Sequence, residues 1–211
     1  AVAVGNQTAD ALIAKMAPQI RAMKIDAGDV EGTDMGPLIS SAHREKVLAG
    51  IDKGINEGAK LIIDGRTFKH PQYPQGFFLG PCLFDDVNEH MSIYQNELFG
   101  PVLVVVRVNS FEEALSLVNK HQYGNGTAIF TRDGFSAREY SQRVQAGMVG
   151  VNIPIPVPIA NHPFGGWKRS AFGDTNMHGD ESIQFYTRRK TVTSKWPETE
   201  LKGNAFAMPT H

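Results

Sequence analysis

The centre of the sequence reads Val102-Leu103-Val104-Val105-Val106-Arg107-Val108. This almost continuous β-branched run predicts a strand that is covered on both faces. After it, helical and strand-like patterns alternate with short connections between them. They predict a helix over 110–121 capped by Ser110, a strand over 127–131, a helix over 134–146 and a strand over 148–152. This order favours an α/β fold, with a mostly parallel sheet, right-handed crossovers and helices on both faces.

The chain before the central strand continues the same α/β pattern. Helical spacing of apolar residues predicts a first helix over 8–25, which Pro18 should bend or split. Three further elements are expected there: a helix that Ser40 and Ser41 begin and Gly58 ends, a strand over 60–64, and a strand over 76–84 that Gly80-Pro81 interrupts. Within the second helix Gly50, Gly54 and Gly58 recur every fourth residue, which predicts helix packing rather than a membrane dimer.

Composition excludes several classes of protein. The chain has 211 residues, of which 41% are hydrophobic and 20% charged, so it can bury a core without a metal or disulfide. A net charge of −1 gives no broad basic field for a nucleic-acid backbone or an anionic membrane. No apolar run is long enough to span a bilayer. Cys82 is the only cysteine, which excludes an intrachain disulfide and a cysteine-based zinc site.

The C-terminal part differs from the rest of the chain in composition and in residue pattern. Four prolines between 153 and 163 predict an extended loop. Partial alternation over 182–196 then predicts one long strand that protrudes as an edge and serves as an oligomerisation arm. The alternative is a terminal strand that folds onto the chain's own sheet. Residues 197–211 form a tail.

Common catalytic motifs are absent from the sequence. Gly124-Asn125-Gly126 begins like a dinucleotide-binding loop, but Ile129 occupies the third glycine position. No phosphate-binding loop, zinc-protease helix or serine-hydrolase elbow occurs. The seven histidines have no paired ligand spacing, so no metal site is predicted, and we expect them to be structural or solvent-facing.

Two residues are candidates for chemistry. Cys82 lies within an apolar strand pattern and is expected to be a small buried thiol, with a cysteine hydrolase as the alternative. Glu97 precedes Leu98-Phe99-Gly100-Pro101 at the entrance to the central strand. A carboxylate in such a turn can accept hydrogen bonds from a ribose diol, although an acid beside a turn is more often only solvated.

The segment around Glu97 resembles a known motif. Asn96-Glu97-Leu98-Phe99-Gly100-Pro101-Val102 is similar to the E-[IL]-F-G-P-V segment of the aldehyde dehydrogenase superfamily. Other matching segments follow in order and in approximate spacing: Phe111-Glu112-Glu113-Ala114, Asn119, Tyr123-Gly124, Phe130-Thr131, Ala146-Gly147, Val151-Asn152, Pro163-Phe164-Gly165-Gly166-Trp167-Lys168, and Tyr186-Thr187 with Lys190. Gly36-Pro37-Leu38-Ile39, Gly58-Ala59 and Gly76-Phe77-Phe78 extend the resemblance towards the N-terminus.

A narrower resemblance rests on the segments after Gly166. The run Arg169-Ser170-Ala171-Phe172-Gly173-Asp174, the following His178-Gly179, the proline loop after Asn152 and the 126–131 segment resemble the methylmalonate-semialdehyde dehydrogenase family. That family is CoA-acylating. The resemblance implies that a cysteine attacks the aldehyde, hydride passes to NAD, and coenzyme A releases propionyl-CoA or acetyl-CoA with loss of carbon dioxide.

The resemblance also implies roles for three residues. Glu97 would accept the hydroxyls of the nicotinamide ribose, Phe99 would pack beside the nicotinamide, and Phe164 would line the aldehyde pocket. Ordinary core packing is the alternative for the two phenylalanines. No catalytic residue is expected in this chain, because the family's nucleophilic cysteine should lie just before Ala1 and the nucleotide-binding domain earlier still. Residues 1–181 would be a catalytic-domain portion, and the chain alone is expected to be inactive.

The expected partners follow from the same resemblance. They are a small-molecule semialdehyde and further copies of the chain, as a dimer or tetramer assembled through the 182–196 arm, with no nucleic acid and no membrane. A bacterial cytoplasm is favoured over a mitochondrial matrix. The alternative function is a stand-alone oligomerisation or regulatory module with no redox activity.

Overall fold

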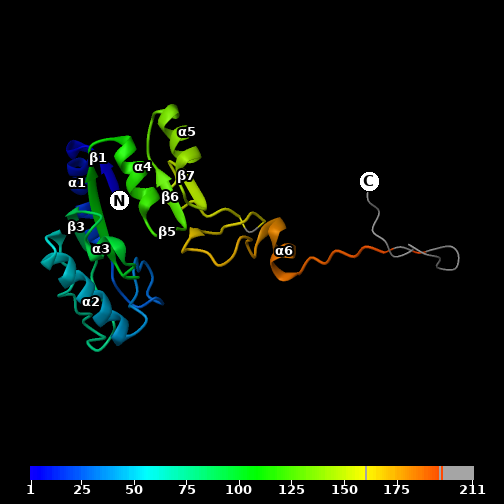
Figure 1. Ribbon diagram of the computed structural model, residues 1–211. Helices are drawn as coiled ribbons and strands as arrows, with labels where there is room; N and C mark the ends of the chain where they lie inside the picture. Colours follow the sequence, from blue (N-terminus) through cyan, green and yellow to red (C-terminus); the bar gives the residue numbers. More distant parts are fainter. Residues whose placement is uncertain (160, 195, 197–211) are drawn as a thin grey trace. The chain divides into compact units, whose positions relative to one another are not determined.

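The computed structural model describes residues 1–159, 161–194 and 196. These residues form two compact units (Figure 1). The first unit comprises Ala1–Val157 and Gly165–Phe172, and the second comprises the described residues of Pro158–Phe164 and those from Gly173 onward.

A four-stranded sheet forms the centre of the first unit. Its strands are β1 (Val2–Val4), β2 (Lys60–Ile63), β3 (Cys82–Val87) and β4 (Val102–Val108). Their order is β1-β4-β3-β2. The central strand β4 runs parallel to both β1 and β3, and only β2 at the edge is antiparallel. The β-branched run therefore occupies an interior position, as the sequence predicted.

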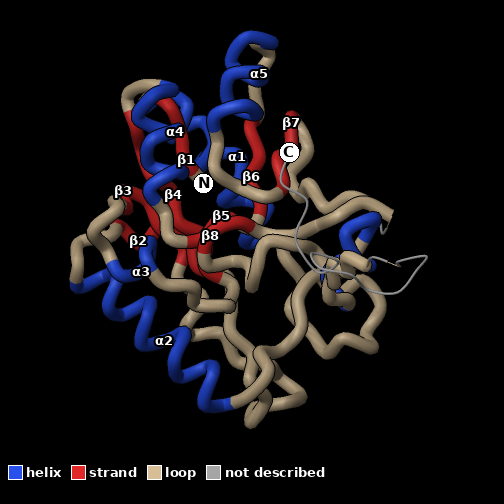
Figure 2. Tube along the Cα trace, turned by 45° about the vertical axis from the view of Figure 1, so that its right-hand side comes forward, coloured by secondary structure: helices blue, strands red, loops and turns tan. Residues whose placement is uncertain are grey.

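Helices cover both faces of this sheet (Figure 2). Helix α1 (Asn6–Ala22) packs over Leu83 and Val105, and helix α2 (Ser41–Asn56) packs over Phe84 and Val106. Neighbouring strand residues thus point to opposite faces, because side chains alternate along a strand. Two further helices, α3 (Ser92–Gln95) and α4 (Phe111–Lys120), add side chains to the α2 face. The predicted α/β class is confirmed.

Two smaller ladders complete the first unit. Strands β6 (Gly126–Ile129) and β7 (Met148–Val151) are parallel, with α5 (Gly134–Arg143) between them in sequence. Strands β5 (Tyr123–Gly124) and β8 (Trp167–Lys168) are antiparallel. After β7, the Asn152 side chain exchanges hydrogen bonds with the backbone of Thr131, at 3.0 and 3.1 Å. The Asn152 amide thus supplies, beyond the end of β6, hydrogen bonds like those that a further pair of strand residues would make.

Two details of the first unit depart from the sequence prediction. Of the two alternatives for Pro18, the split does not occur, because Pro18 lies inside one helix that ends at Ala22. The strand expected over 76–84 begins only at Cys82, because Pro81 has no N–H to donate and Gly80 is bonded elsewhere. The Gly80 N–H donates to the Gly65 carbonyl at 3.0 Å. A Cβ added at Gly65 would lie 2.1 Å from the Gly80 carbonyl carbon, so the two backbones meet where no side chain fits.

The second unit does not contain the long strand that the sequence predicted over 182–196. Ser182–Tyr186 is helix α6, which follows the 3-10 turn Gly179–Glu181, and residues 187–194 belong to no strand. A strand needs a neighbour to accept and donate its backbone hydrogen bonds, and no neighbour exists within the described residues. Residue 195 and the predicted tail over 197–211 lie outside the described residues.

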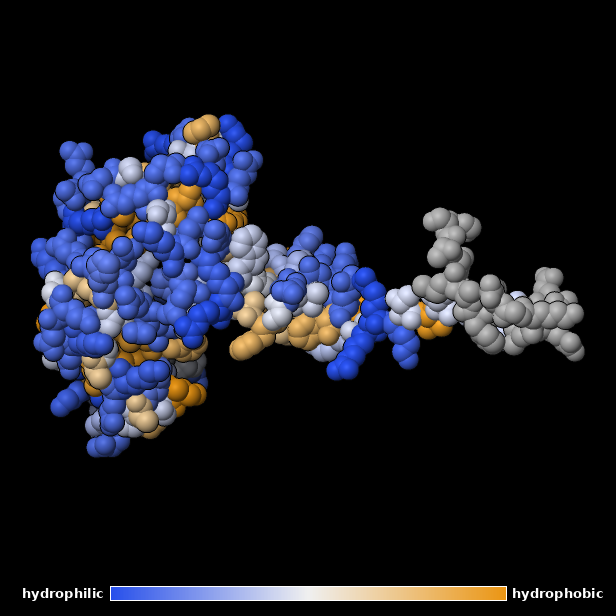
Figure 3. All heavy atoms as spheres, viewed as in Figure 1, coloured by the Kyte–Doolittle hydropathy of each residue, from blue (hydrophilic) through white to orange (hydrophobic). Residues whose placement is uncertain are grey.

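The surface of the first unit is mostly hydrophilic in the view of Figure 3, and its apolar side chains form separate patches. Within the part of the chain that the structure describes, no helix is both long enough and apolar enough to cross a membrane.

One buried carboxylate belongs to the sheet. Asp85 is 2% exposed and lies beside Asp86, whose φ is +54° at a bulge between β3 and β4. Arg107 on β4 donates to both Asp85 oxygens, at 2.9 and 2.7 Å, and also to Asp10 on α1 at 2.7 Å. The hydrogen bonds from Arg107 hold the pKa of the Asp85 carboxyl below its ordinary value. Arg107, through its bonds to Asp85 and Asp10, therefore joins β3, β4 and α1.

We expect Asp85→Asn to lower the free energy of unfolding by about 1.5–3 kcal/mol at pH 7, because a buried hydrogen-bonded charge is lost. Because the pKa of Asp85 is lowered in the fold, its contribution is present above the unfolded value near 4 and is lost as the pH falls below it. The difference between the wild type and the variant should therefore shrink below pH ~4. Urea unfolding at several pH values measures it.

Asp10→Asn is the matched control, since the Asp10 side chain is 70% exposed and pairs with the same arginine. It should change stability much less. A pH-independent difference for Asp85→Asn, or equal effects of the two variants, would contradict this role of Asp85.

Candidate functional site

The turn between α3 and β4 presents two side chains to solvent. Glu97 is exposed and Phe99 is 79% exposed, whereas Leu98 between them is half-buried and packs against the core. Phe99 has a φ of +54°, in the left-handed region that a bulky residue rarely adopts. Such a conformation persists only where the surroundings impose it. The turn is therefore a constrained feature with an outward-facing carboxylate and aromatic ring.

Two hollows flank this turn. One, of about 540 Å³, lies between α2 and the turn and is lined by Lys46, Gly50, Lys53 and Glu97, among others. The second, of about 290 Å³, is lined by Glu97, Phe99 and the start of β4. Among the described residues no donor is hydrogen-bonded to the Glu97 carboxylate. The geometry thus leaves this carboxylate open to accept hydrogen bonds from a ligand hydroxyl.

Helix α2 holds the backbone of the turn. His43 Nε2 lies 2.8 Å from the Phe99 carbonyl oxygen, within hydrogen-bond distance. The sequence predicts His43 only as a structural or solvent-facing histidine and does not indicate this contact, since the two residues are 56 positions apart. No spacing rule signals such a contact. The conformation of the turn is thus fixed in part by a residue of another element.

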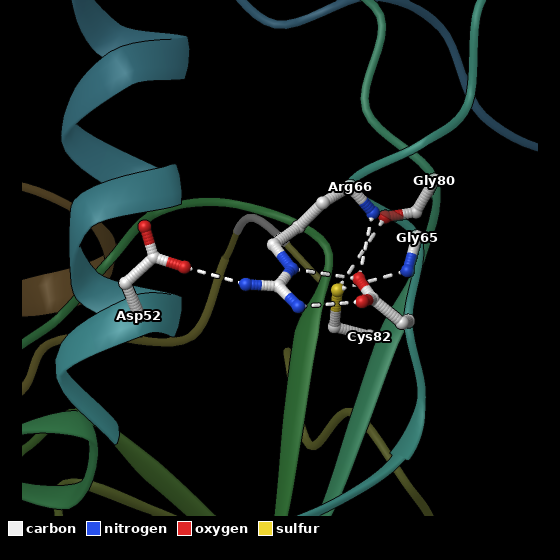
Figure 4. Close-up of polar contacts among 6 residues, drawn as sticks. Asp52, Gly65, Arg66, Gly80 and Cys82 are labelled. Atoms are coloured by element: carbon white, nitrogen blue, oxygen red, sulfur yellow. Dashed lines mark hydrogen bonds and ion pairs between the residues drawn. The ribbon is translucent and has the colours of Figure 1, made fainter. Parts of the chain in front are cut away.

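Cys82 has the environment of a structural thiol. It is 1% exposed, and its sulfur accepts a hydrogen bond from the Gly65 N–H at 3.2 Å (Figure 4). Burial raises the pKa of the Cys82 thiol. Above it, Arg66 forms ion pairs with Asp64 at 2.6 Å and with Asp52 of α2 at 2.5 Å. A protonated, enclosed thiol is a poor nucleophile, so nothing in this arrangement favours a cysteine hydrolase.

Phe164 belongs to the second unit. Its ring stacks on the ring of His178, with centroids 4.3 Å apart and an interplanar angle of 17°, and it is 36% exposed. This stacking accounts for its local packing. Its expected role in an aldehyde pocket stays a prediction.

The first unit has other hollows, and one of about 440 Å³ is lined by Glu89, His90, Lys120 and His121, among others. A separate hollow of about 520 Å³, lined by Ala27, Pro37 and residues 72–78, holds no carboxylate, cation or thiol. Among the described residues, no group of three or more His, Cys, Asp or Glu side chains could hold a metal ion. The turn at Glu97 is the candidate site on the first unit because it combines an open carboxylate with an exposed aromatic ring between two hollows.

A mostly parallel sheet flanked by helices, with an open carboxylate and an exposed aromatic ring at the entrance to its central strand, places the chain in the class of α/β proteins. Comparisons with known proteins agree with this class. The profile of the aldehyde dehydrogenase family matches residues 1–192. The chain belongs to the aldehyde dehydrogenase family.

Individual relatives have narrower names. The chain is 55% identical over 210 residues to malonate-semialdehyde dehydrogenase of Pseudomonas aeruginosa, covering 99% of this chain and 42% of that protein. It is 44% identical over 190 residues to the human methylmalonate-semialdehyde/malonate-semialdehyde dehydrogenase [acylating], mitochondrial, covering 89% of this chain and 36% of that one. The chain thus spans about two fifths of the length of these curated relatives.

Solved structures give the same result. A Sinorhizobium meliloti protein assigned as a methylmalonate-semialdehyde dehydrogenase, complexed with NAD, has a TM-score of 0.89 and 54% identity, over 94% of this chain and 40% of that one. Methylmalonate-semialdehyde dehydrogenase from Oceanimonas doudoroffii has a TM-score of 0.88 and 49% identity, over 94% and 41%. The predicted resemblance to this family is confirmed.

We predict that Cys82 in the native chain reacts with a thiol reagent at least about 100-fold more slowly than in the unfolded chain, because reaction requires opening of the core. Absorbance of released thionitrobenzoate at pH 8 measures the rate, and the same sample in guanidinium gives the reference. A native rate close to that of the unfolded chain would contradict the structural role of the thiol.

Proposed function

We propose that this chain contributes to an NAD-dependent, CoA-acylating dehydrogenase of methylmalonate or malonate semialdehyde. The names of its relatives support the substrate class, and the word "acylating" in the human relative's name supports transfer to coenzyme A. The observation that carries the proposal is the open carboxylate of Glu97 beside exposed Phe99 on a constrained turn.

In this proposal, Glu97 and Phe99 hold the nicotinamide end of NAD. Glu97 accepts hydrogen bonds from the hydroxyls of the nicotinamide ribose, and a charged acceptor makes such bonds stronger than a neutral one. Phe99 offers an apolar face beside the nicotinamide ring. When bound, NAD supplies the acceptor for the hydride of the aldehyde. The two side chains fit that role because both are exposed and the carboxylate has free lone pairs.

The proposed nucleophile is a cysteine that is not among these 211 residues. Cys82 is the only cysteine of the chain, and its burial excludes attack on a bound aldehyde. The overall proposed reaction converts methylmalonate semialdehyde to propionyl-CoA, or malonate semialdehyde to acetyl-CoA, with loss of carbon dioxide. Phe164 is proposed to line the aldehyde pocket.

Assembly and location are also part of the proposal. Several apolar side chains of the second unit are exposed, namely Ile183 (72%), Tyr186 (72%), Val192 (75%) and Trp196 (87%). Exposed apolar residues in one segment support an interface with another copy, as a dimer or tetramer. The higher identity to a bacterial relative than to a mitochondrial one supports a bacterial cytoplasm over a mitochondrial matrix.

We predict that Glu97→Gln, in the complete enzyme that contains this chain, raises the KM for NAD by about 10- to 100-fold, because a charged acceptor is lost. The KM for the semialdehyde should change little. NADH absorbance measures both constants. Glu31→Gln removes another exposed carboxylate and should have no effect. An unchanged KM for NAD in Glu97→Gln would contradict the proposed ribose contact.

The 211-residue chain assayed alone is the second arm of this experiment. Without an accessible thiol it should produce no NADH from the semialdehyde. NADH formation by this chain would contradict the proposal that the nucleophile is not among these 211 residues. A complete protein that is folded but inactive with both semialdehydes would favour the alternative of an oligomerisation or regulatory module.

A further inference from the structure

Segment 92–100, which carries Glu97 and Phe99, lies along one face of α2. The segment meets the helix through two polar contacts, at His43 and at the C-cap residue Glu57, and through three close approaches, at Val47, Gly50 and Gly54. These residues are spaced by four, three, four and three positions. Residues at that spacing lie on one side of a helix. We name these five residues the docking face of α2.

Two glycines bring the segment close to the helix. A Cβ at Gly50 would lie 2.4 Å from Leu98 Cδ2, and a Cβ at Gly54 would lie 2.8 Å from Ile93 Cδ1. Both distances are below 3.0 Å, which real Cβ atoms essentially never show. The side chains of Ile93 and Leu98 therefore fill the space that helix side chains would otherwise occupy.

The close approach is reciprocal at the start of β4. A Cβ at Gly100 would lie 2.8 Å from Cγ1 of Val47, which is fully buried. Because glycine lowers the intrinsic stability of a helix, two glycines inside α2 are unfavourable unless close packing requires them. The contacts on this face supply that requirement.

Polar contacts fix the two ends of the same segment. The Glu57 carboxylate accepts hydrogen bonds from the Ser92 N–H at 2.6 Å and from the Ser92 hydroxyl at 2.8 Å. At the other end, His43 bonds the Phe99 carbonyl at 2.8 Å. Leu98 is the apolar anchor between them, and its neighbours on either side are Glu97 and Phe99. A displacement of the Leu98 backbone must therefore move both proposed ligand-binding residues.

We propose that Gly50 and Gly54 are positioning residues for NAD binding, acting through Leu98 and Ile93 on the turn that holds Glu97 and Phe99. This inference rests on the proposed function. It gives Gly50 and Gly54 a role in ligand binding, in addition to the helix packing that the sequence predicted for the glycine repeat. A methyl group at Gly50 would overlap Leu98 Cδ2. Because Leu98 is packed against the core, we expect the turn to shift with it, while the helix itself becomes more stable.

The test compares Gly50→Ala with a rescue variant in the complete enzyme that contains this chain. Gly50→Ala should raise the KM for NAD by about tenfold or more, with the KM for the semialdehyde nearly unchanged, because small displacements of binding groups are costly. Leu98→Ala removes the three atoms that the new methyl group would meet, which are Cγ, Cδ1 and Cδ2. The double variant should therefore bind NAD better than Gly50→Ala alone, although less well than the wild type because it lacks the Leu98 anchor.

Gly134→Ala is the matched control. It adds the same methyl group to a helical glycine of α5, where the nearest atom to the new Cβ is Arg138 Nη1 at 3.5 Å. Its kinetic constants should equal those of the wild type. Should Gly50→Ala not fold, Leu98→Ala alone tests the proposal, because loss of the anchor should also raise the KM for NAD.

Hydrogen exchange of segment 96–102 in the NAD-free protein tests the packing of the turn separately from its role in NAD binding. Gly50→Ala should exchange faster there than the wild type, and the double variant should exchange more slowly than Gly50→Ala. If this pattern holds but no variant alters NAD binding, the packing stands and its proposed role in NAD binding is overturned. Unchanged exchange and an unchanged KM in Gly50→Ala would overturn the positioning role, and equal increases in both KM values would do the same. A wild-type protein that does not bind NAD would overturn the proposed function itself.

Discussion

The contact between helix α2 and the segment before β4 is the constraint on which the proposed site depends. One face of the helix receives Ile93 and Leu98 against glycines, while Glu57 and His43 bond the ends of the segment. With Leu98 held inward, Glu97 and Phe99 on either side are exposed. The left-handed backbone at Phe99 is sustained by these contacts rather than by its own preference. Packing on one side of the turn thus creates a binding surface on the other.

The sheet gives this contact a rigid support. Strand β4 begins directly after the turn and is paired on both sides, so the end of the segment cannot move independently. Two residues of α2, Val47 and Ile51, are fully buried in the core between the helix and the strands. Asp85 and Arg107 join β3, β4 and α1 on the same sheet. Loops that carry function are positioned in this way by a scaffold with a well-packed core.

Local signals in the sequence predicted most of the first unit. The β-branched run gave β4, and Ser40 and Ser110 were expected to begin their helices, where their hydroxyls accept from the third backbone N–H at 3.2 Å. The site itself was predicted only through a family motif, because an acid beside a turn has no distinctive pattern. The contact of His43 with Phe99 joins distant residues, which periodicity cannot detect. The prediction of a strand over 182–196 was wrong, because alternation of apolar and polar residues does not provide the neighbouring strand that pairing requires.

The central claim is that this packing presents Glu97 to the nicotinamide ribose. An NAD analogue that lacks the hydroxyls of that ribose tests it most directly in the complete enzyme. The wild type should discriminate against the analogue by about 10- to 100-fold in kcat/KM, and Glu97→Gln should lose most of that discrimination, since the variant and the analogue remove the same contact. Equal discrimination by the wild type and by Glu97→Gln would show that the hydroxyls are bound elsewhere and would contradict the account.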